Sequence, residues 1–290
     1  MERSDAPAAP ALLDSAFSAA KMAYNLSNGR DPYPGWARVP YPADSEKGKA
    51  LSKAEAFEVV APDGQRFVTF TGTNRKGDVL SDAGNFVGIK TGKYLAAATV
   101  GELYRGENVV MTGHSLGGGL AKTAAAVASH SQSEQEKPAP CVAVGFNAAP
   151  IGTRVLAEHG VDAKHLESET IAVVNRNDAI NRYTWGGKLY AGRGGAAITE
   201  RGNPDEVLVI ADGKGSAWGF SGHSIADLAD PKDPTKLTER LSIGENPVQK
   251  ATFDRFARAR EAISDPREVS KTLDTVKALH HEQSRGLDGL

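Results

Sequence analysis

Residues 109–121 constrain the fold of this chain more than any other stretch. They read Val-Val-Met-Thr-Gly-His-Ser-Leu-Gly-Gly-Gly-Leu-Ala, an apolar run that passes through a glycine-flanked serine into small residues. The first part is typical of a buried strand, and the last part of a helix that packs closely on a neighbour. A turn this tight needs residues without bulky side chains at both ends, where Gly113 and Gly117 stand. The stretch therefore predicts a strand, a sharp turn with Ser115 at its apex, and a helix.

Such a turn gives Ser115 the setting of a nucleophile. It lifts the hydroxyl clear of the backbone, and it brings the N–H groups at the start of the next helix beside that hydroxyl. The alternative, a glycine-rich turn with a solvated serine, leaves the apolar run and the later glycines unexplained. We therefore expect a serine hydrolase, in which His114 supports the turn and is too constrained to act on Ser115 itself.

Elsewhere in the chain, strand patterns alternate with helix patterns. Strands are predicted over residues 57–60, 67–70, 108–112, 142–146, 170–175 and 207–210, with a hairpin turn at Asp63-Gly64. Helices are predicted over 10–26, 88–105, 117–130 and 152–159, and loops over 28–43, 131–139 and 186–203. Alternation of this kind gives a mostly parallel sheet flanked by helices, so the expected fold class is α/β.

The tail carries two more helical patterns within residues 248–283, separated by Pro266. They fit helices that cover the core, or an appendage that docks a partner such as an inhibitor or an export adaptor. We place one domain over residues 1–245, including the N-terminal helix, and an extra C-terminal helical segment over 246–290.

Composition excludes several classes of protein. The net charge of −2 does not suggest a nucleic-acid binder. The single cysteine, Cys141, lies in an apolar stretch and fits a buried, inert thiol. The chain holds no apolar run of about 18 residues, and its charged start is unlike a signal peptide. We expect synthesis in the cytoplasm, and export by a route that reads no such signal stays open.

A serine nucleophile requires a base, and the base requires an orienting carboxylate. On a strand–turn–helix of this kind, the acid and then the histidine follow the serine along the chain. Asp178 comes just after the strand predicted over 170–175, at the carboxyl end where the acid should lie. Asp178 also fits the cap of a helix beginning at Ala179, and the two roles are compatible.

His223 is the expected base, because it follows Asp178 and lies in a loop of small residues beyond the last strand signal. A lone loop histidine is otherwise structural or solvated. The other histidines stand inside the turn, before the acid, or in the tail: His114, His130, His159, His165, His280 and His281.

The oxyanion of an acyl-transfer intermediate needs two preorganised N–H donors. Leu116, directly after the serine, supplies one of them. The loop after the strand 67–70 supplies the other through Thr73, whose hydroxyl offers a further donor. Gly72 and Asp78 are expected to support this loop.

These segments resemble the class 3 lipase family, which has the α/β-hydrolase fold. That family pairs a Gly-His-Ser-Leu-Gly-Gly turn with an upstream Phe-Arg-Gly-Thr segment and a following Asp-Trp-x-x-Asp. Here the turn matches fully, residues 70–73 read Phe-Thr-Gly-Thr, and residues 78–82 read Asp-Val-Leu-Ser-Asp. Thr71 and Val79 thus replace the arginine and the tryptophan, and the resemblance covers roughly residues 55–225.

The resemblance implies hydrolysis of lipid carboxylic esters, as a lipase or phospholipase A, through an acyl-enzyme on Ser115. It implies no metal and no organic cofactor, and only transient contact with a membrane surface. Some similar bacterial proteins are lipase or phospholipase toxins exported without a signal peptide, so an antibacterial effector is one expectation. The alternatives are a small-ester carboxylesterase, an acyltransferase, and an inactive lipase-fold binding protein.

Two segments are candidates for a mobile cover over an apolar groove. Residues 74–88 follow the expected oxyanion loop, and residues 184–203 carry Trp185 and Tyr190 among glycines. An ordinary surface loop fits both segments equally well. The carboxylates of Asp78 and Asp82 leave a calcium site open.

Overall fold

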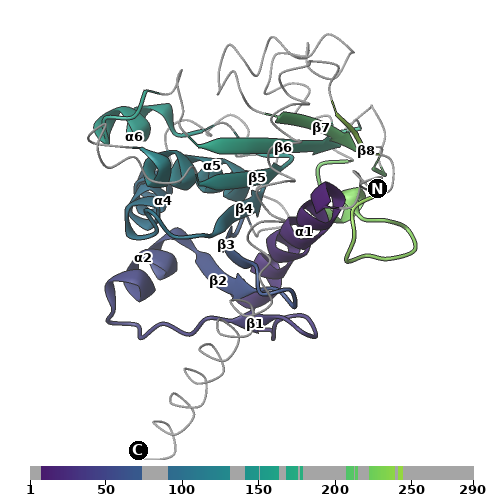
Figure 1. Cartoon of the computed structure of the whole chain (residues 1–290), viewed down its shortest axis with the longest axis horizontal. Coiled ribbons are helices and arrows are strands. Elements are labelled where there is room, and N and C mark those ends of the chain that lie inside the picture. The colour runs from purple at the N-terminus through teal and green to yellow at the C-terminus, as the bar shows by residue number, and fades with distance from the viewer. Residues whose placement is uncertain are drawn as a thin grey trace, which may run out of the picture.

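Figure 1 shows a computed structural model of the chain. The structure describes residues 8–73, 91–130, 141–149, 151–162, 168–175, 177–178, 207–211, 213–214, 222–238 and 241–243. Within these residues, eight strands form one sheet in chain order. The strands are Ala37–Arg38 (β1), Ala56–Val60 (β2), Arg66–Phe70 (β3), Val110–His114 (β4), Val142–Phe146 (β5), Glu169–Asn175 (β6), Val207–Ala211 (β7) and Leu241–Ile243 (β8). The fold is therefore of the α/β class, as predicted.

The order of the strands decides where the helices lie. Strands β3 to β7 run parallel, and β1, β2 and β8 pair with their neighbours in antiparallel fashion. Parallel strands that step in one direction through right-handed crossovers place their connecting helices on one face of the sheet. The helices on that face are α2 (Glu46–Ala54), α4 (Thr91–Leu103), α5 (Leu116–Ser129) and α6 (Thr153–Glu158), which pack on one another (Figure 1).

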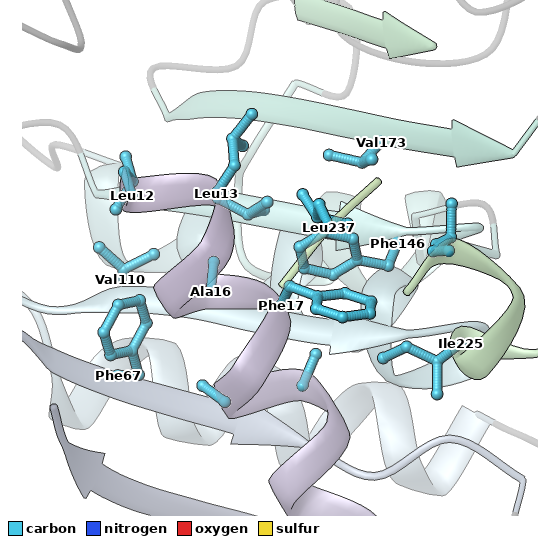
Figure 2. Close-up of a cluster of buried hydrophobic side chains, with 14 of the residues drawn as sticks. Leu12, Leu13, Ala16, Phe17, Phe67, Val110, Phe146, Val173, Ile225 and Leu237 are labelled. Atoms are coloured by element: carbon cyan, nitrogen blue, oxygen red, sulfur yellow. The ribbon is translucent and has the colours of Figure 1, made fainter. Parts of the chain in front are cut away.

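Helix α1 (Ala8–Ser27) covers the opposite face of the sheet (Figure 1). Figure 2 shows Phe17 of α1 directed at Phe146 of β5, and the two rings meet edge to face with centroids 5.5 Å apart. The short helix η4 (Ile225–Leu228) and Leu237 complete this cover. A fully buried phenylalanine side chain contributes about 2 kcal/mol, so a few such contacts fix α1 on the sheet.

The central strands divide their side chains between two cores. Phe67 and Val110 pack with α1, whereas Val68 and Met111 pack with α4 and α5. Successive side chains of a strand point to opposite faces, so strands buried on both faces consist of unbroken apolar runs. These runs are the signal by which the sequence predicts the strands.

The predicted strands and helices with described residues are present, with ends that differ by at most a few residues. Four elements were not predicted. The loop expected over 28–43 contains strand β1, helix α2 follows it, and the short helix η4 and strand β8 come after the last predicted strand. Helix α2 is rich in lysine and buries only Ala50, Leu51 and Ala54, so its apolar pattern is weak. Its usable signal is Ser45, whose side chain caps the helix by accepting a hydrogen bond from the N–H of Gly48.

Several predictions fall on other parts of the chain. Outside the described residues lie the loops predicted over 131–139 and 186–203 and the C-terminal helices. The two candidate covers, 74–88 and 184–203, also lie outside them. The boundary placed at residue 245 also stays a prediction. Among the helices that the structure describes, none combines the length and the apolarity needed to cross a bilayer.

Candidate active site

The carboxyl ends of the parallel strands meet at one edge of the sheet, where the functional residues of such folds gather. The loop 71–73 follows β3, Ser115 follows β4, and Asp178 comes shortly after β6. His223 reaches this edge from the residues just before η4. Four segments that are distant in the sequence therefore share one edge.

The backbone at Ser115 is strained and firmly held. Its φ of 56° and ψ of −123° are rarely adopted by an L-residue. The N–H of Ser115 donates to the carbonyl of Phe146 at 3.0 Å, and the Ser115 carbonyl accepts from Ala149 at 2.8 Å and Gly118 at 3.1 Å. Strained residues persist when surrounding bonds fix them in this way, and they concentrate at functional sites.

The glycines that flank Ser115 have no room for a side chain. A β-carbon at Gly113 would lie 2.4 Å from the carbonyl group of Gly117, and one at Gly117 would lie 2.2 Å from the carbonyl oxygen of Phe70. The start of α5 is thus pressed against the ends of β3 and β4. This close approach sets the sharp angle of the turn.

The structure brings Ser115, His223 and Asp178 together. Nε2 of His223 lies 3.0 Å from Oγ of Ser115, and Nδ1 of His223 lies 2.8 Å from Oδ2 of Asp178. All three residues are buried. Because a carboxylate accepts the Nδ1 proton, the lone pair of Nε2 faces the serine hydroxyl. This tautomer is the one that can take a proton from Ser115.

The loop after β3 lies directly against the turn. A β-carbon at Gly72 would lie 2.6 Å from the carbonyl oxygen of His114. Leu116 is the first residue of α5, and the first N–H groups of a helix have no carbonyl partner within it. The predicted oxyanion residues, Thr73 and Leu116, therefore belong to adjacent segments, whereas Asp78 lies outside the described residues.

His114 is buried beneath the site, and both of its ring nitrogens have partners. Nε2 lies 2.6 Å from the carbonyl oxygen of His223, and Nδ1 lies 2.8 Å from Oη of Tyr24. Burial, reinforced by the neighbouring His223 ring, lowers the pKa of His114 to about 3. His114 is therefore a neutral structural partner of the site, and its link to Tyr24 on α1 was not foreseen from the sequence.

Two asparagine side chains support the loop of His223, and neither was predicted as a site residue from the sequence. Asn147 follows β5, and its Nδ2 donates to the carbonyls of Gly222 and His223 at 3.2 Å each. Asn175 ends β6, and its Nδ2 donates to Gly222 at 2.8 Å. The two are joined, because Oδ1 of Asn147 accepts the N–H of Asn175 at 2.8 Å. Their sequence signal is a polar residue at the carboxyl end of an apolar strand.

Among the residues that the structure describes, no three His, Cys, Asp or Glu side chains converge as metal ligands would. Asp78 and Asp82, the carboxylates considered for calcium, lie outside these residues. The site that the structure does describe consists of groups for proton transfer and hydrogen bonding.

The chain is similar to known phospholipases. The model of a phospholipase-like family, described as the Tle-like phospholipase domain, matches residues 18–187, which is more than half of the chain. The match includes the positions of Ser115 and Asp178 and reaches into α1, whereas the resemblance to class 3 lipases begins near residue 55.

One curated relative is the extracellular phospholipase A1 of Serratia liquefaciens. The chain is 36% identical to it over 107 residues, which are 36% of this chain and 30% of that protein. The chain thus spans less than a third of the length of this relative.

Proposed function

The chain belongs to the Tle-like phospholipase family, and we propose that it is a serine-dependent phospholipase A that transfers a phospholipid acyl group to Ser115 and then to water. The observation that carries this proposal is the hydrogen-bonded series from Asp178 through His223 to Ser115. The strained turn and the adjacent loop after β3 support it further.

In the first half of the reaction, Ser115 Oγ attacks the carbonyl carbon of the ester as Nε2 of His223 takes its proton. The negative charge that develops on the carbonyl oxygen is met by the N–H groups of Leu116 and Thr73. The tetrahedral intermediate then collapses. The bond to the lysophospholipid oxygen breaks, and that oxygen takes the proton from His223.

In the second half, a water molecule gives a proton to His223 and attacks the acyl-enzyme. Collapse of the second intermediate breaks the ester bond to Ser115, whose Oγ recovers the proton. One phospholipid and one water thereby give one lysophospholipid and one fatty acid. Asp178 holds the tautomer of His223 and stabilises the imidazolium that forms twice in the cycle.

The test is the release of fatty acid from liposomes of phosphatidylcholine or phosphatidylglycerol. We expect release by the wild type and a loss of about 10⁴-fold or more in Ser115→Ala, because the nucleophile and base act as a unit. Ser52→Ala is the matched control, since Ser52 is an exposed serine on α2. Equal release by the wild type and Ser115→Ala contradicts the proposal.

The relative named phospholipase A1 favours the first acyl position of the glycerol as the point of cleavage. A phosphatidylcholine with different fatty acids at its two positions tests this, because the identity of the released acid reveals the position. Release of the acid from the second position alone refutes the preference and leaves the phospholipase proposal intact.

The alternatives from the sequence are distinguished by three further measurements. Cleavage of short p-nitrophenyl esters but not of liposomes indicates a small-ester carboxylesterase. Transfer of the acyl group to an added alcohol in preference to water indicates an acyltransferase. A biological effect that survives Ser115→Ala indicates a binding protein.

We also propose that the chain acts outside the cell that makes it, as an antibacterial effector. Support comes from the relative, which is named extracellular, and from the resemblance to exported toxins. We expect growth inhibition when the protein is directed to the bacterial periplasm, and none with Ser115→Ala. Docking of an inhibitor or an export adaptor by residues 246–290 stays a prediction.

A further inference from the structure

We propose that Tyr24 is a positioning residue of this active site, which acts on His223 through His114. The inference rests on the proposed function. Tyr24 belongs to α1 and lies outside the turn, the oxyanion loop and the segments of the acid and base. Its hydroxyl nevertheless lies 2.8 Å from Nδ1 of His114, the residue next to the nucleophile.

The partners of His114 fix the direction of each hydrogen bond. The carbonyl oxygen of His223 can only accept, so Nε2 of His114, at 2.6 Å from it, carries the proton. In the neutral ring, Nδ1 is then an acceptor, and the hydroxyl of Tyr24 must donate to it. Tyr24 thereby selects the tautomer of His114 that holds the backbone of His223.

The oxygen of Tyr24 also contacts the loop after β3. Gly72 lies so close to it that a β-carbon on Gly72 would be 2.2 Å from Oη. A continuous series of contacts thus runs from Gly72 through Tyr24 and, by hydrogen bonds, through His114 to His223. The series joins the proposed oxyanion loop to the proposed base through one side chain of α1.

The position of Tyr24 is itself well determined, because α1 is tied to the sheet and to the segment after His223. Thr69 donates to the carbonyl of Ala19 in α1 at 2.9 Å, and Oγ1 of Thr112 lies 3.2 Å from the carbonyl oxygen of Ala16. Asp14 accepts the N–H of Leu237 at 3.0 Å. A helix held on both sides is a rigid mount for a residue that orients catalytic groups.

The neutrality of His114 matters to the chemistry. The rings of His114 and His223 have centroids 5.2 Å apart. A positive charge on His114 would oppose the imidazolium that His223 must form in each transition state. A hydroxyl that donates to Nδ1 satisfies the neutral ring, so Tyr24 stabilises the form that leaves His223 basic.

The test is Tyr24→Phe, which removes the hydroxyl and keeps the ring. Hydrolysis of phosphatidylglycerol liposomes should show a kcat lower by about tenfold or more at an unchanged KM, because misplaced catalytic groups weaken transition-state interactions alone. The matched control is Thr69→Val, which removes another hydrogen bond between α1 and the sheet. Thr69→Val should lower the melting temperature and leave kcat within about twofold of the wild type, because the hydrogen bond that it removes does not contact the active site.

A double-mutant cycle with His114→Gln tests whether Tyr24 acts through His114. In that background, Tyr24→Phe should change kcat by less than about twofold, because residues that act as a unit are not additive. The inference is overturned if the fold-loss of kcat in the double variant equals the product of the losses in the two single variants. A wild-type kcat in Tyr24→Phe, or a loss equal to that of Thr69→Val, also overturns it.

Labelling of Ser115 by a fluorophosphonate separates this inference from the proposed function. A wild type that neither hydrolyses lipid nor becomes labelled overturns the proposed function and the inference with it. A wild type that is labelled, together with a Tyr24→Phe variant that is labelled at the same rate, overturns the inference alone. Slower labelling of Tyr24→Phe supports it.

Discussion

The carbonyl oxygen of His223 lies 2.6 Å from Nε2 of His114, so the residue before the proposed nucleophile holds the backbone of the proposed base. The side chain of His223 is thereby oriented from two directions, by Asp178 at its ring and by His114 at its main chain. The turn and the loop of the base form one hydrogen-bonded unit. A substitution in the turn should therefore also affect the loop of His223, and a substitution in that loop should affect the turn.

The pH dependence of stability should carry the signature of His114. Burial lowers the pKa of His114 from its ordinary value of 6.5 to about 3. Between these values the unfolded chain binds a proton at His114 that the folded chain does not. The contribution of the neutral His114 to the stability of the fold is therefore present in full above pH 6.5 and is lost as the pH falls toward 3. We expect the free energy of unfolding to fall by up to about 1.4 kcal/mol per pH unit within this window from His114 alone.

Urea unfolding of the wild type and His114→Gln at a series of pH values from neutral downward checks this. The variant should show a shallower pH dependence, because glutamine does not titrate. The comparison of slopes is independent of any constant loss of stability that the substitution brings. Parallel slopes in the two proteins would show that His114 does not resist protonation in the fold.

Gly222→Ala should damage the site more than an ordinary glycine substitution does. Gly222 has a φ of +92°, and a β-carbon there would lie 2.4 Å from the carbonyl oxygen of Asn177, next to Asp178. The clash would move His223 away from its acid, so we expect kcat to fall by about tenfold or more. Gly29→Ala is the control, since Gly29 has a φ of +70° but open space around it.

Gly29→Ala should lower the free energy of unfolding by about 1 kcal/mol and leave kcat unchanged, because it brings backbone strain alone. Similar kinetic losses in the two variants would mean that the clash with Asn177 has no special effect.

Asn147 should be required for activity through its side chain. Its φ of 44° is a conformation that asparagine tolerates better than alanine does. Asn147→Gly keeps the backbone relaxed and removes the amide that binds Gly222, His223 and Asn175. We expect a loss of about 1–3 kcal/mol in unfolding free energy from unpaired buried groups, together with a lower kcat.

Asn147→Ala should lose further stability, since it adds strain to the same loss of hydrogen bonds. Thermal melts and liposome assays of both variants measure the two effects. Full activity in Asn147→Gly would show that Asn175 and His114 suffice to hold the loop.

The elements that the sequence predicts well are those buried on both faces of the sheet. Strands β4 to β6 are almost wholly buried and are rich in apolar residues, and the glycines around Ser115 mark the turn between β4 and α5. Strand β1 could not be predicted, because two residues at the edge of the sheet that pair only with β2 carry no periodic signal. Helix α2 depends on its cap and on three buried positions, of which two are alanines, and a search for apolar stripes overlooks them.

The residues of the candidate site also fall into two groups, those that the sequence predicts and those that it does not. Ser115, Asp178 and His223 follow from their order and from the ends of strands, which are local features. Tyr24 and Asn147 meet their partners across 90 and 75 residues of sequence, and only the folded chain brings these pairs together. A hydrogen bond of this kind depends on how α1 crosses the sheet, and no short pattern encodes that crossing.

The thiol of Cys141 should report on global unfolding. Cys141 is buried at the start of β5, where its N–H donates to Oγ of Ser129 at the end of α5. Burial raises the pKa of the thiol to about 12, so the reactive thiolate is scarce in the native protein at neutral pH. Alkylation by iodoacetamide should therefore be very slow in buffer and fast in concentrated guanidinium. Its rate at intermediate urea should follow the unfolded fraction measured by circular dichroism, because β5 lies in the middle of the sheet and opens only with it. Rapid alkylation under native conditions would instead reveal a local opening at the junction of α5 and β5.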